Sequence, residues 1–248
     1  MAGTALRRRL GARWQSAELV EAAQETATAR TLRFRVPEWP GHLPGQHVDV
    51  RLTAEDGYTA QRSYSLSAPA AEDVIEMSVQ LVADGEVSPY LVSDIAVGDT
   101  VEVRGPLGGW FVWRTTQSEP VLLIGGGSGI APLMAMVRAR RAADTGGAFR
   151  LLYSVRTPAD VFYADELHDS HGVEVAVLYT RAAAEGVARP AHRIDADDLT
   201  AHGWPVVAEV TCYVCGPTPF VEAIADQLVQ AGHDPAHIRT ERFGASGG

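Results

Sequence analysis

The stretch Val121–Met134, with the sequence VLLIGGGSGIAPLM, decides how the rest of the chain is interpreted. Its first four residues are branched and apolar, which is typical of a strand buried on both faces of a parallel sheet. Glycines follow, and Pro132 then opens an apolar stripe with helical spacing, as proline is tolerated in the first turn of a helix. A glycine turn between strand and helix points backbone N–H groups at one spot, which suits a phosphate. The G-x-G-x-x-G spacing fails at Ile130, so an ordinary tight turn stays an alternative.

The sequence on either side of this stretch predicts two domains. After residue 116, strands and helices alternate, which is typical of βαβ units and a doubly wound parallel sheet. We expect strands at 121–125, 149–154, 173–179, 210–215 and 237–243, and helices ending near 143 and spanning 159–169, 195–201 and 218–231. Before residue 115, short alternating strands separated by turn signals favour an antiparallel β-barrel with a short helix at 88–93. The predicted domains are residues 1–115 and 116–248.

Charge and apolar patterning exclude several classes of protein. The formal net charge of −10 over 248 residues argues against general nucleic-acid binding. No apolar run approaches the roughly 18 residues that a membrane span requires. Arg7–Arg9 resembles the basic start of an export signal, but no apolar stretch follows it, so we expect a cytoplasmic protein. Two further groups of arginines are either solvated surface or a docking patch for an acidic partner: Arg30, Arg33 and Arg35, and Arg138, Arg140 and Arg141.

The chain has only two cysteines, Cys212 and Cys215, in a C-x-x-C pair. The residues around them read as a strand, and no second pair completes four ligands for zinc. An iron–sulfur cluster of the usual kind needs four thiolates, so this chain alone cannot hold one. We therefore expect no metal site.

The segment Arg62–Leu66 combines side chains that suit a phosphorylated aromatic cofactor. On a strand, Arg62, Tyr64 and Leu66 share one face, and Ser63 and Ser65 share the other. Arginine can grip a phosphate with a fork of donors, and tyrosine offers a flat amphipathic ring. From these residues alone, an ordinary strand is an equally good interpretation.

Three segments in register extend this interpretation to a family. Arg62–Leu66, Gly125–Pro132 and Cys215–Pro217, in this order, resemble the ferredoxin–NADP reductase superfamily. The resemblance covers roughly residues 14–244 and is nearest to bacterial reductase components of oxygenase systems, in a form without a fused ferredoxin. It implies FAD as the cofactor, with FMN as the alternative, and we expect a monomer.

The resemblance also assigns roles in the barrel. It implies that Arg62 contacts the flavin pyrophosphate, Tyr64 lies against the isoalloxazine and Ser65 hydrogen-bonds near its reactive N5. Ser63 and Leu66 complete this flavin-binding segment. The second flavin-phosphate segment follows: Gly85, Val87 and Ser88. Its helix start independently suits a phosphate. Further along, Trp110 and Phe111 lie in a segment that closes the barrel, and we expect them in the core, with contact to an adenine as the alternative.

In the second domain, the resemblance implies that the glycine turn cradles the pyrophosphate of the nicotinamide dinucleotide, through Gly126, Gly127, Ser128, Gly129 and Ile130. Cys215 would lie beside the nicotinamide, with Gly216 and Pro217 next to it. A small buried apolar residue is the alternative role for Cys215.

The nucleotide preference depends on Ser154, Arg156 and Arg181, which follow two predicted strands where an adenosine ribose would lie. A 2′-phosphate needs cations and hydroxyls, whereas a bare ribose diol usually meets an acidic residue. The arginines therefore favour NADPH, with NADH or plain surface positions as alternatives. Arg189 and Arg193 are weaker candidates.

The end of the chain also resembles the family. Phe243 would cover the far face of the flavin until nicotinamide displaces it, and the glycine-rich tail Gly244–Gly248 would let it move. Glu241 is either a proton relay or a solvated carboxylate.

These observations predict a flavin-dependent NAD(P)H oxidoreductase that delivers single electrons to a ferredoxin serving a cytochrome P450 or an oxygenase. One alternative is a flavin or ferric-chelate reductase with small-molecule acceptors. Another is a flavin-bearing electron-transfer or sensor subunit without turnover.

Arg62→Ala tests the flavin assignment. Because Arg62 is expected to neutralise a cofactor phosphate, the variant should purify colourless or only weakly yellow, as measured by its visible absorption. A full complement of flavin in the variant would remove Arg62 from the site.

Overall fold

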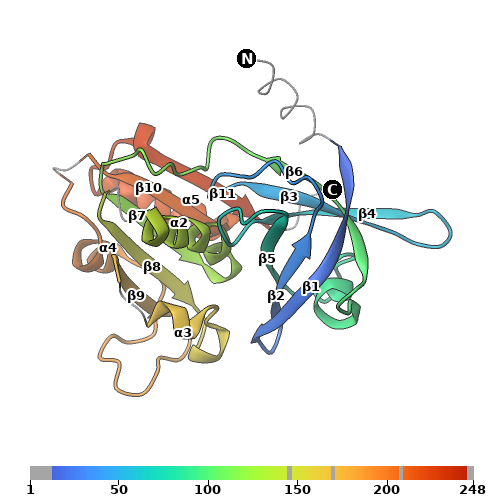
Figure 1. The fold of residues 1–248 in the computed structure, drawn as a ribbon. Coiled ribbons are helices and arrows are strands. Elements are labelled where there is room, and N and C mark those ends of the chain that lie inside the picture. The colour runs from blue at the N-terminus through green and yellow to red at the C-terminus, as the bar shows by residue number, and fades with distance from the viewer. Residues whose placement is uncertain (1–12, 144–146, 169–170, 207–208, 245–248) are drawn as a thin grey trace, which may run out of the picture. The chain divides into compact units, whose positions relative to one another are not determined.

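The computed structural model describes residues 13–143, 147–168, 171–206 and 209–244, and the chain divides into two compact units, Met1–Val112 and Trp113–Gly248. Each unit has its own sheet (Figure 1). The predicted roles of Arg7–Arg9 and of the tail beyond Gly244 fall outside the described residues. In the described part of the chain, no helix is both long enough and apolar enough to cross a membrane.

The first unit is built on a six-stranded antiparallel sheet in the order β4-β3-β6-β1-β2-β5. Its strands are β1 (Trp14–Thr26), β2 (Ala29–Arg35), β3 (His47–Thr53), β4 (Thr59–Ser65), β5 (Val74–Gln80) and β6 (Thr100–Leu107). A bridge from Leu66 to Met77 links the chain after β4 to β5, so the sheet curls toward closure. The inward residues of each strand form one apolar core, as the alternating sequence predicts. The expected barrel-like fold is confirmed.

The second unit is a five-stranded parallel sheet in the order β11-β10-β7-β8-β9. Its strands are β7 (Val121–Gly126), β8 (Phe149–Val155), β9 (Val173–Tyr179), β10 (Thr211–Pro217) and β11 (Ile238–Phe243). The helices are α2 (Ile130–Ala143), α3 (Ala164–Leu167), α4 (Ala196–His202) and α5 (Thr218–Gln230). The predicted doubly wound fold is therefore confirmed.

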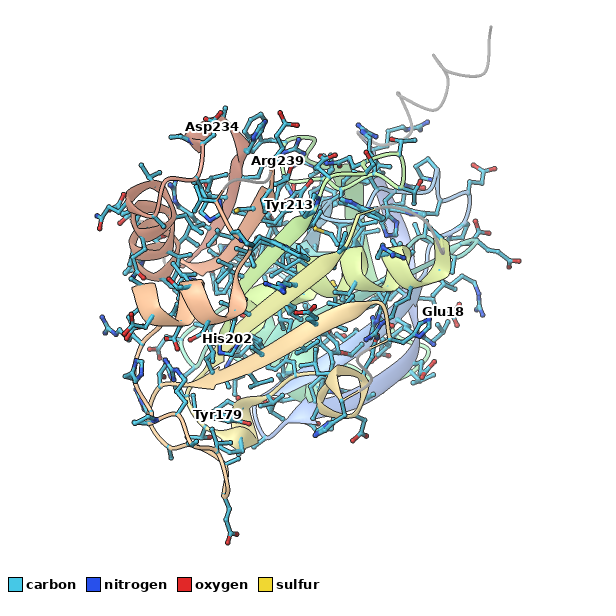
Figure 2. The ribbon with its side chains drawn as sticks, turned by 90° about the vertical axis from the view of Figure 1, so that its left-hand side faces the viewer. Glu18, Tyr179, His202, Tyr213, Asp234 and Arg239 are labelled. Atoms are coloured by element: carbon cyan, nitrogen blue, oxygen red, sulfur yellow. The ribbon has the colours of Figure 1, made fainter. Side chains whose placement is uncertain are left out.

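Helices cover both faces of this parallel sheet. Leu122 and Ile124 of β7 pack in one cluster with residues of α4 and α5. Gly125 alternates with Ile124 and lies against Leu133 of α2 on the opposite face. At the β11 edge of the sheet, Tyr213 of β10 and Arg239 of β11 are neighbours. The Arg239 guanidinium donates to the Tyr213 phenol oxygen at 3.2 Å (Figure 2).

Two expectations about local structure are wrong. The predicted helix 159–169 is a 3₁₀ turn at Pro158–Asp160 followed by the one-turn helix α3. Tyr163 interrupts it with a left-handed backbone (φ 55°), and its ring is buried beside Phe162, so packing outweighs helical periodicity. Trp110 was expected in the core but is 62% exposed, whereas Phe111 is buried as expected.

Candidate functional site

Strand β4 presents the predicted flavin-binding side chains on two faces. Its register places Arg62 opposite Val50 and Tyr64 opposite Val48, and both valines belong to the barrel core. Arg62 and Tyr64 therefore lie on the inner side of the sheet, at its edge. Burial raises the pKa of the Tyr64 phenol, so it stays neutral. Leu66, just beyond the strand, is fully buried.

Ser63 lies on the opposite face of β4, where it contacts a buried carboxylate. Its hydroxyl donates to Asp49 at 2.7 Å, and Arg104 donates to the other oxygen of Asp49 at 2.5 Å. Burial alone would raise the pKa of Asp49, but these two donors outweigh it and lower the pKa. Asp49 of β3 thus links the edge strand β4, through Ser63, to β6, through Arg104. A contact between the Ser63 side chain and flavin stays a prediction, as does the N5 contact of Ser65.

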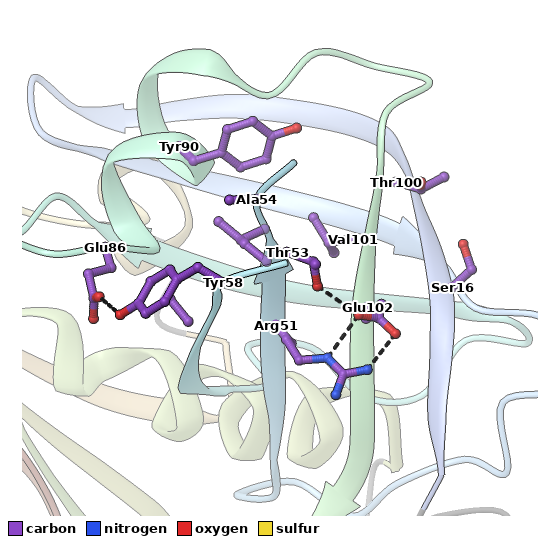
Figure 3. A pocket seen from close by; sticks show the side chains of 12 residues that line it. Ser16, Arg51, Thr53, Ala54, Tyr58, Glu86, Tyr90, Thr100, Val101 and Glu102 are labelled. Carbon is purple, nitrogen blue, oxygen red and sulfur yellow. Dashed lines mark hydrogen bonds and ion pairs between the residues drawn. The ribbon is translucent and has the colours of Figure 1, made fainter. Parts of the chain in front are cut away.

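Arg62 reaches the second predicted phosphate segment through Glu86. The guanidinium donates to Glu86 at 2.8 Å. The Tyr58 hydroxyl donates to the other carboxylate oxygen of Glu86, as Figure 3 shows. Both hydrogen bonds lower the pKa of Glu86, which therefore stays ionised near neutral pH. The fold thus brings Arg62 and residues 85–88 together, although they are far apart in sequence.

Within this segment, Gly85 permits a tight turn. A Cβ atom at Gly85 would lie 3.0 Å from the Ser88 hydroxyl and 3.0 Å from the Val82 carbonyl oxygen. The Ser88 hydroxyl accepts from the Val82 N–H at 3.0 Å, and both Ser88 and Val87 are buried. The Ser88 oxygen is thus already bonded within the turn, and its contact with a flavin phosphate stays a prediction. The helical turn Tyr90–Asp94 follows it.

The hydrogen-bond donors of the barrel suit a flavin phosphate. The half-exposed guanidinium of Arg62 already holds one anion, the Glu86 carboxylate, so the same donors suit a phosphate oxygen. The neutral ring of Tyr64 lies two residues along the same face. A flavin nucleotide has both groups that these residues suit, an anionic phosphate for Arg62 and an aromatic ring for Tyr64.

In the second unit, the glycine turn after β7 packs directly on the end of β10. Gly127–Gly129 form a 3₁₀ turn that leads into α2 at Ile130. A Cβ atom at Gly129 would overlap the carbonyl oxygen of Cys215 and lie 2.8 Å from the Cα of Gly216. Only glycine allows this approach, so the fold brings two predicted nucleotide-binding segments together.

The turn also leaves open space where a ligand can enter. Gly127 has a left-handed backbone (φ 55°), and a Cβ atom there would meet nothing within 4 Å. Beside it begins the 14-residue helix α2, whose N-terminal end is favourable for an anion. Pro132 lies in the first turn of that helix, as predicted. An open glycine turn at a helix start fits the pyrophosphate of a dinucleotide.

Phe220 of α5 was not singled out from the sequence, yet it supports this arrangement. A Cβ atom at Gly126 or at Gly216 would lie 2.8 or 2.7 Å from the Phe220 ring. The ring therefore fills the space that both glycines leave at the ends of β7 and β10. An aromatic residue three positions after Pro217 was the available sequence signal, but its partners depend on the sheet order.

Cys215 and Glu241 are neighbours on adjacent strands. The register pairs Cys215 of β10 with Glu241 of β11. Complete burial raises the pKa of the Cys215 thiol, and the negative charge of Glu241 raises it further. A neutral thiol is a poor nucleophile, so covalent catalysis is disfavoured. Cys212 is also a free buried thiol, with a pKa raised by burial to about 12.

The predicted nucleotide-selecting residues lie at the ends of β8 and β9. Thr180 N–H donates to the Val155 carbonyl at 2.8 Å, and Arg181 N–H donates to the Arg156 carbonyl at 2.9 Å. Arg156 and Arg181 are exposed and adjacent, and Ser154 is buried at the end of β8. Phe243 is 39% exposed at the end of β11.

Arg189 has a structural role instead. Its guanidinium forms two hydrogen bonds with Asp198, at 2.5 and 2.6 Å, and donates to backbone carbonyl groups that include Tyr179. His192, Asp195 and Asp198 bring three potential metal ligands together, but Arg189 already neutralises Asp198. Neither a 2′-phosphate nor a metal ion is favoured there.

The arginine clusters considered as docking patches are bonded within their own units. In the barrel, Arg30 donates to the Val92 carbonyl, and Arg33 and Arg35 pair with glutamates of β1 and β5. In the second unit, Arg138 and Arg141 pair with Glu166, and Arg140 donates to the Gly147 carbonyl. These contacts show how the arginines stabilise the surface of each unit, and a docking patch for an acidic partner stays a prediction.

Two protein-family models match this chain. Residues 16–112 match the oxidoreductase FAD-binding domain, and residues 123–226 match the oxidoreductase NAD-binding domain. The two matches coincide with the barrel and the parallel sheet. This chain therefore carries one domain for each cofactor.

Curated relatives are named as reductase components. The ferredoxin reductase component of 3-ketosteroid-9-alpha-monooxygenase from Mycolicibacterium smegmatis is 30% identical over 245 residues, 94% of this chain and 67% of that protein. The reductase component of the naphthalene 1,2-dioxygenase/salicylate 5-hydroxylase systems from a Ralstonia species is 29% identical over 90% of this chain and 67% of the relative. Propane 2-monooxygenase reductase from Mycolicibacterium goodii is 31% identical, and the chain spans 61% of its length.

Solved structures share the whole fold. The FAD/NAD-binding domain of nitric oxide dioxygenase from Vibrio cholerae is 26% identical, with a TM-score of 0.82 over 93% of this chain and 98% of that chain. A ferredoxin NADP⁺ reductase from Neisseria gonorrhoeae, with bound FAD and NADP, has a TM-score of 0.79 over 93% of this chain and 99% of that chain. At 20% identity, the second likeness concerns the fold alone.

Gly129→Ala tests the close contact between the glycine turn and β10. The added methyl group overlaps the Cys215 carbonyl, and relieving such overpacking costs about 1–3 kcal/mol. We expect NADP⁺ affinity, measured by calorimetry, to fall about tenfold while flavin content is retained. Gly109→Ala is the matched control, since its methyl group would meet nothing within 4 Å. Unchanged NADP⁺ affinity and thermal stability in Gly129→Ala would contradict the contact.

Proposed function

The chain belongs to the ferredoxin–NADP reductase superfamily, and from this premise we propose that it oxidises NADPH and passes the electrons, by way of FAD, to a separate ferredoxin. Membership of this family establishes the two cofactor-binding domains and the oxidoreductase class. The preference for NADPH, the identity of the acceptor and the residue roles are the proposal. The observation that carries it is the presence in one chain of two arrangements that suit a phosphate, the half-exposed guanidinium of Arg62 in the barrel and the open Gly127 turn in the parallel sheet.

The residues of the barrel bind and orient the flavin in this proposal. Arg62 holds the pyrophosphate by charge and hydrogen bonding, and the neutral Tyr64 ring supports the isoalloxazine. Asp49 keeps the edge strand in register through Ser63. When bound, FAD would supply the capacity to take up a hydride and to release single electrons, which is chemistry that these side chains do not have.

The residues of the parallel sheet align the nicotinamide nucleotide. The backbone of the Gly126–Ile130 turn binds the pyrophosphate, and Cys215, whose thiol stays neutral, lies beside the nicotinamide. Glu241, next to Cys215, is the candidate for holding a proton there. The protein's contribution is therefore alignment rather than covalent catalysis.

The neighbouring backbone positions of Arg156 and Arg181 support NADPH as the donor. Both are exposed at the ends of neighbouring strands, where parallel sheets bind the adenosine half of a dinucleotide. The names of the relatives support a ferredoxin acceptor, since two of those described above are ferredoxin reductase components. This chain spans about two thirds of the length of these relatives. A ferredoxin partner for this chain is therefore part of the proposal.

Replacing Arg156 and Arg181 by alanine tests the choice of NADPH. Each charge-assisted hydrogen bond to a 2′-phosphate contributes about 1.5–3 kcal/mol, so KM for NADPH should rise about tenfold to a hundredfold per residue. KM for NADH should change little, because NADH lacks that phosphate. Arg35→Ala, in the barrel, is the control. Equal effects on both nucleotides would overturn the NADPH assignment.

Electron delivery to a ferredoxin tests the acceptor. We expect NADPH-dependent cytochrome c reduction by the FAD-loaded protein to be stimulated by an added ferredoxin at low ionic strength and suppressed by salt. Free flavin and ferric chelate, tested as acceptors in parallel, should be reduced more slowly. Absence of any stimulation across a panel of ferredoxins, with rapid ferric-chelate reduction, would favour a small-molecule acceptor instead.

A further inference from the structure

A carboxylate of the chain itself already contacts the donors proposed for the flavin phosphate. The Arg62 guanidinium donates to Glu86 at 2.8 Å, and its other amino group donates to the Gln61 carbonyl at 2.7 Å. A carboxylate and a phosphate present similar anionic oxygens, and both pair with the fork of donors on an arginine. A flavin phosphate that approaches Arg62 therefore meets a second anion at the same guanidinium.

Two segments of the barrel hold Glu86 in this position. Its other carboxylate oxygen accepts a hydrogen bond from the hydroxyl of Tyr58, which lies in the β3–β4 hairpin (Figure 3). The turn that carries Glu86 is fixed as well, because the Gly85 N–H donates to the Val82 carbonyl at 2.9 Å and the two residues after Glu86 are buried. The fold thus places the carboxylate against Arg62.

The ion pair is charged and open to a ligand. Hydrogen bonds from Tyr58 and from Arg62 lower the pKa of the Glu86 carboxyl group, which is therefore ionised near neutral pH. The side chains of Arg62 and Glu86 are 52% and 42% exposed. Glu86 and Tyr58 also line a cavity of about 500 Å³, so the carboxylate has open space if it leaves Arg62. A phosphate can thus reach the guanidinium, but it does so against a negative charge.

We infer that Glu86 competes with the flavin phosphate for Arg62 and thereby limits how strongly the barrel prefers phosphorylated flavins over riboflavin. The inference rests on the proposed position of that phosphate at Arg62. FMN and FAD must either displace the carboxylate or share the guanidinium with it, and both arrangements weaken binding because like charges repel. Riboflavin has the same ring system and no phosphate, so Glu86 leaves its binding unchanged. Glu86 is therefore a residue that determines specificity among flavins.

Flavin binding to the full-length chain, freed of flavin, tests this inference without any measurement of activity. FMN and riboflavin would be titrated separately, and the quenching of flavin fluorescence would give each dissociation constant. Glu86→Gln keeps the size of the side chain and removes its charge. Because exposed ion pairs are of modest strength, we expect the variant to bind FMN about three- to tenfold more tightly than the wild type. Its affinity for riboflavin should not change.

Glu18→Gln is the matched control. Glu18 is also a half-exposed carboxylate of the barrel, and it pairs with a half-exposed arginine, Arg35, at 3.4 Å. The control changes the net charge of the chain by the same amount as Glu86→Gln but leaves Arg62 and its partner intact. Its affinity for FMN should therefore equal that of the wild type.

The outcomes separate this inference from the proposed function. An FMN affinity of Glu86→Gln that is unchanged or weaker would overturn the competition at Arg62 and leave a flavoprotein intact. An equal gain in affinity for riboflavin, or an equal gain for FMN in Glu18→Gln, would also overturn it, because neither gain depends on a phosphate at Arg62. Failure of the wild type to bind FMN, FAD or riboflavin would instead overturn the proposed function.

Discussion

The second unit depends on close contact between backbone and backbone at the ends of β7 and β10. Gly129 lies against Cys215 and Gly216, and the ring of Phe220 occupies the space left by Gly126 and Gly216. A side chain at Gly129 would separate the glycine turn from the strand that carries Cys215. In the first unit, the hydrogen bonds of Asp49 to Ser63 and Arg104 hold the edge strand β4 in an equivalent way. In both units, local packing fixes the position of groups that would bind a cofactor.

The order of the elements could be predicted because burial leaves a direct pattern in the sequence. Val121–Ile124 is continuously apolar because helices cover both faces of β7, whereas β3 alternates because one face forms the barrel core and the other carries polar residues such as Asp49. The expected helix 159–169 failed because the buried ring of Tyr163 holds the chain in a left-handed conformation. The prediction that Trp110 lies in the core was also wrong, because a large apolar residue in a loop is not part of a periodic pattern that could assign it to a core.

The candidate site was predictable where its residues are contiguous and not where they meet through the fold. Arg62–Ser65 and Gly126–Ile130 each form a local motif with its own physical rationale. Asp49, Tyr58 and Phe220 matter through partners on other elements, so the sequence around each of them gave little signal. The alternation of β3 did place Asp49 on a polar face, but its burial depends on Arg104 of β6. Similarly, the bonds of Arg189 to Asp198 and to backbone carbonyls follow from tertiary structure.

A single anaerobic mixing experiment tests the central claim, that one chain binds a flavin and a nicotinamide nucleotide so that they react. Protein loaded with FAD would be mixed with NADPH in a stopped-flow instrument, and the visible flavin absorption would be followed. The account predicts rapid, complete loss of that absorption in one turnover, at a rate that saturates with NADPH concentration. Retention of the oxidised flavin spectrum, in protein shown by calorimetry to bind both FAD and NADP⁺, would contradict it.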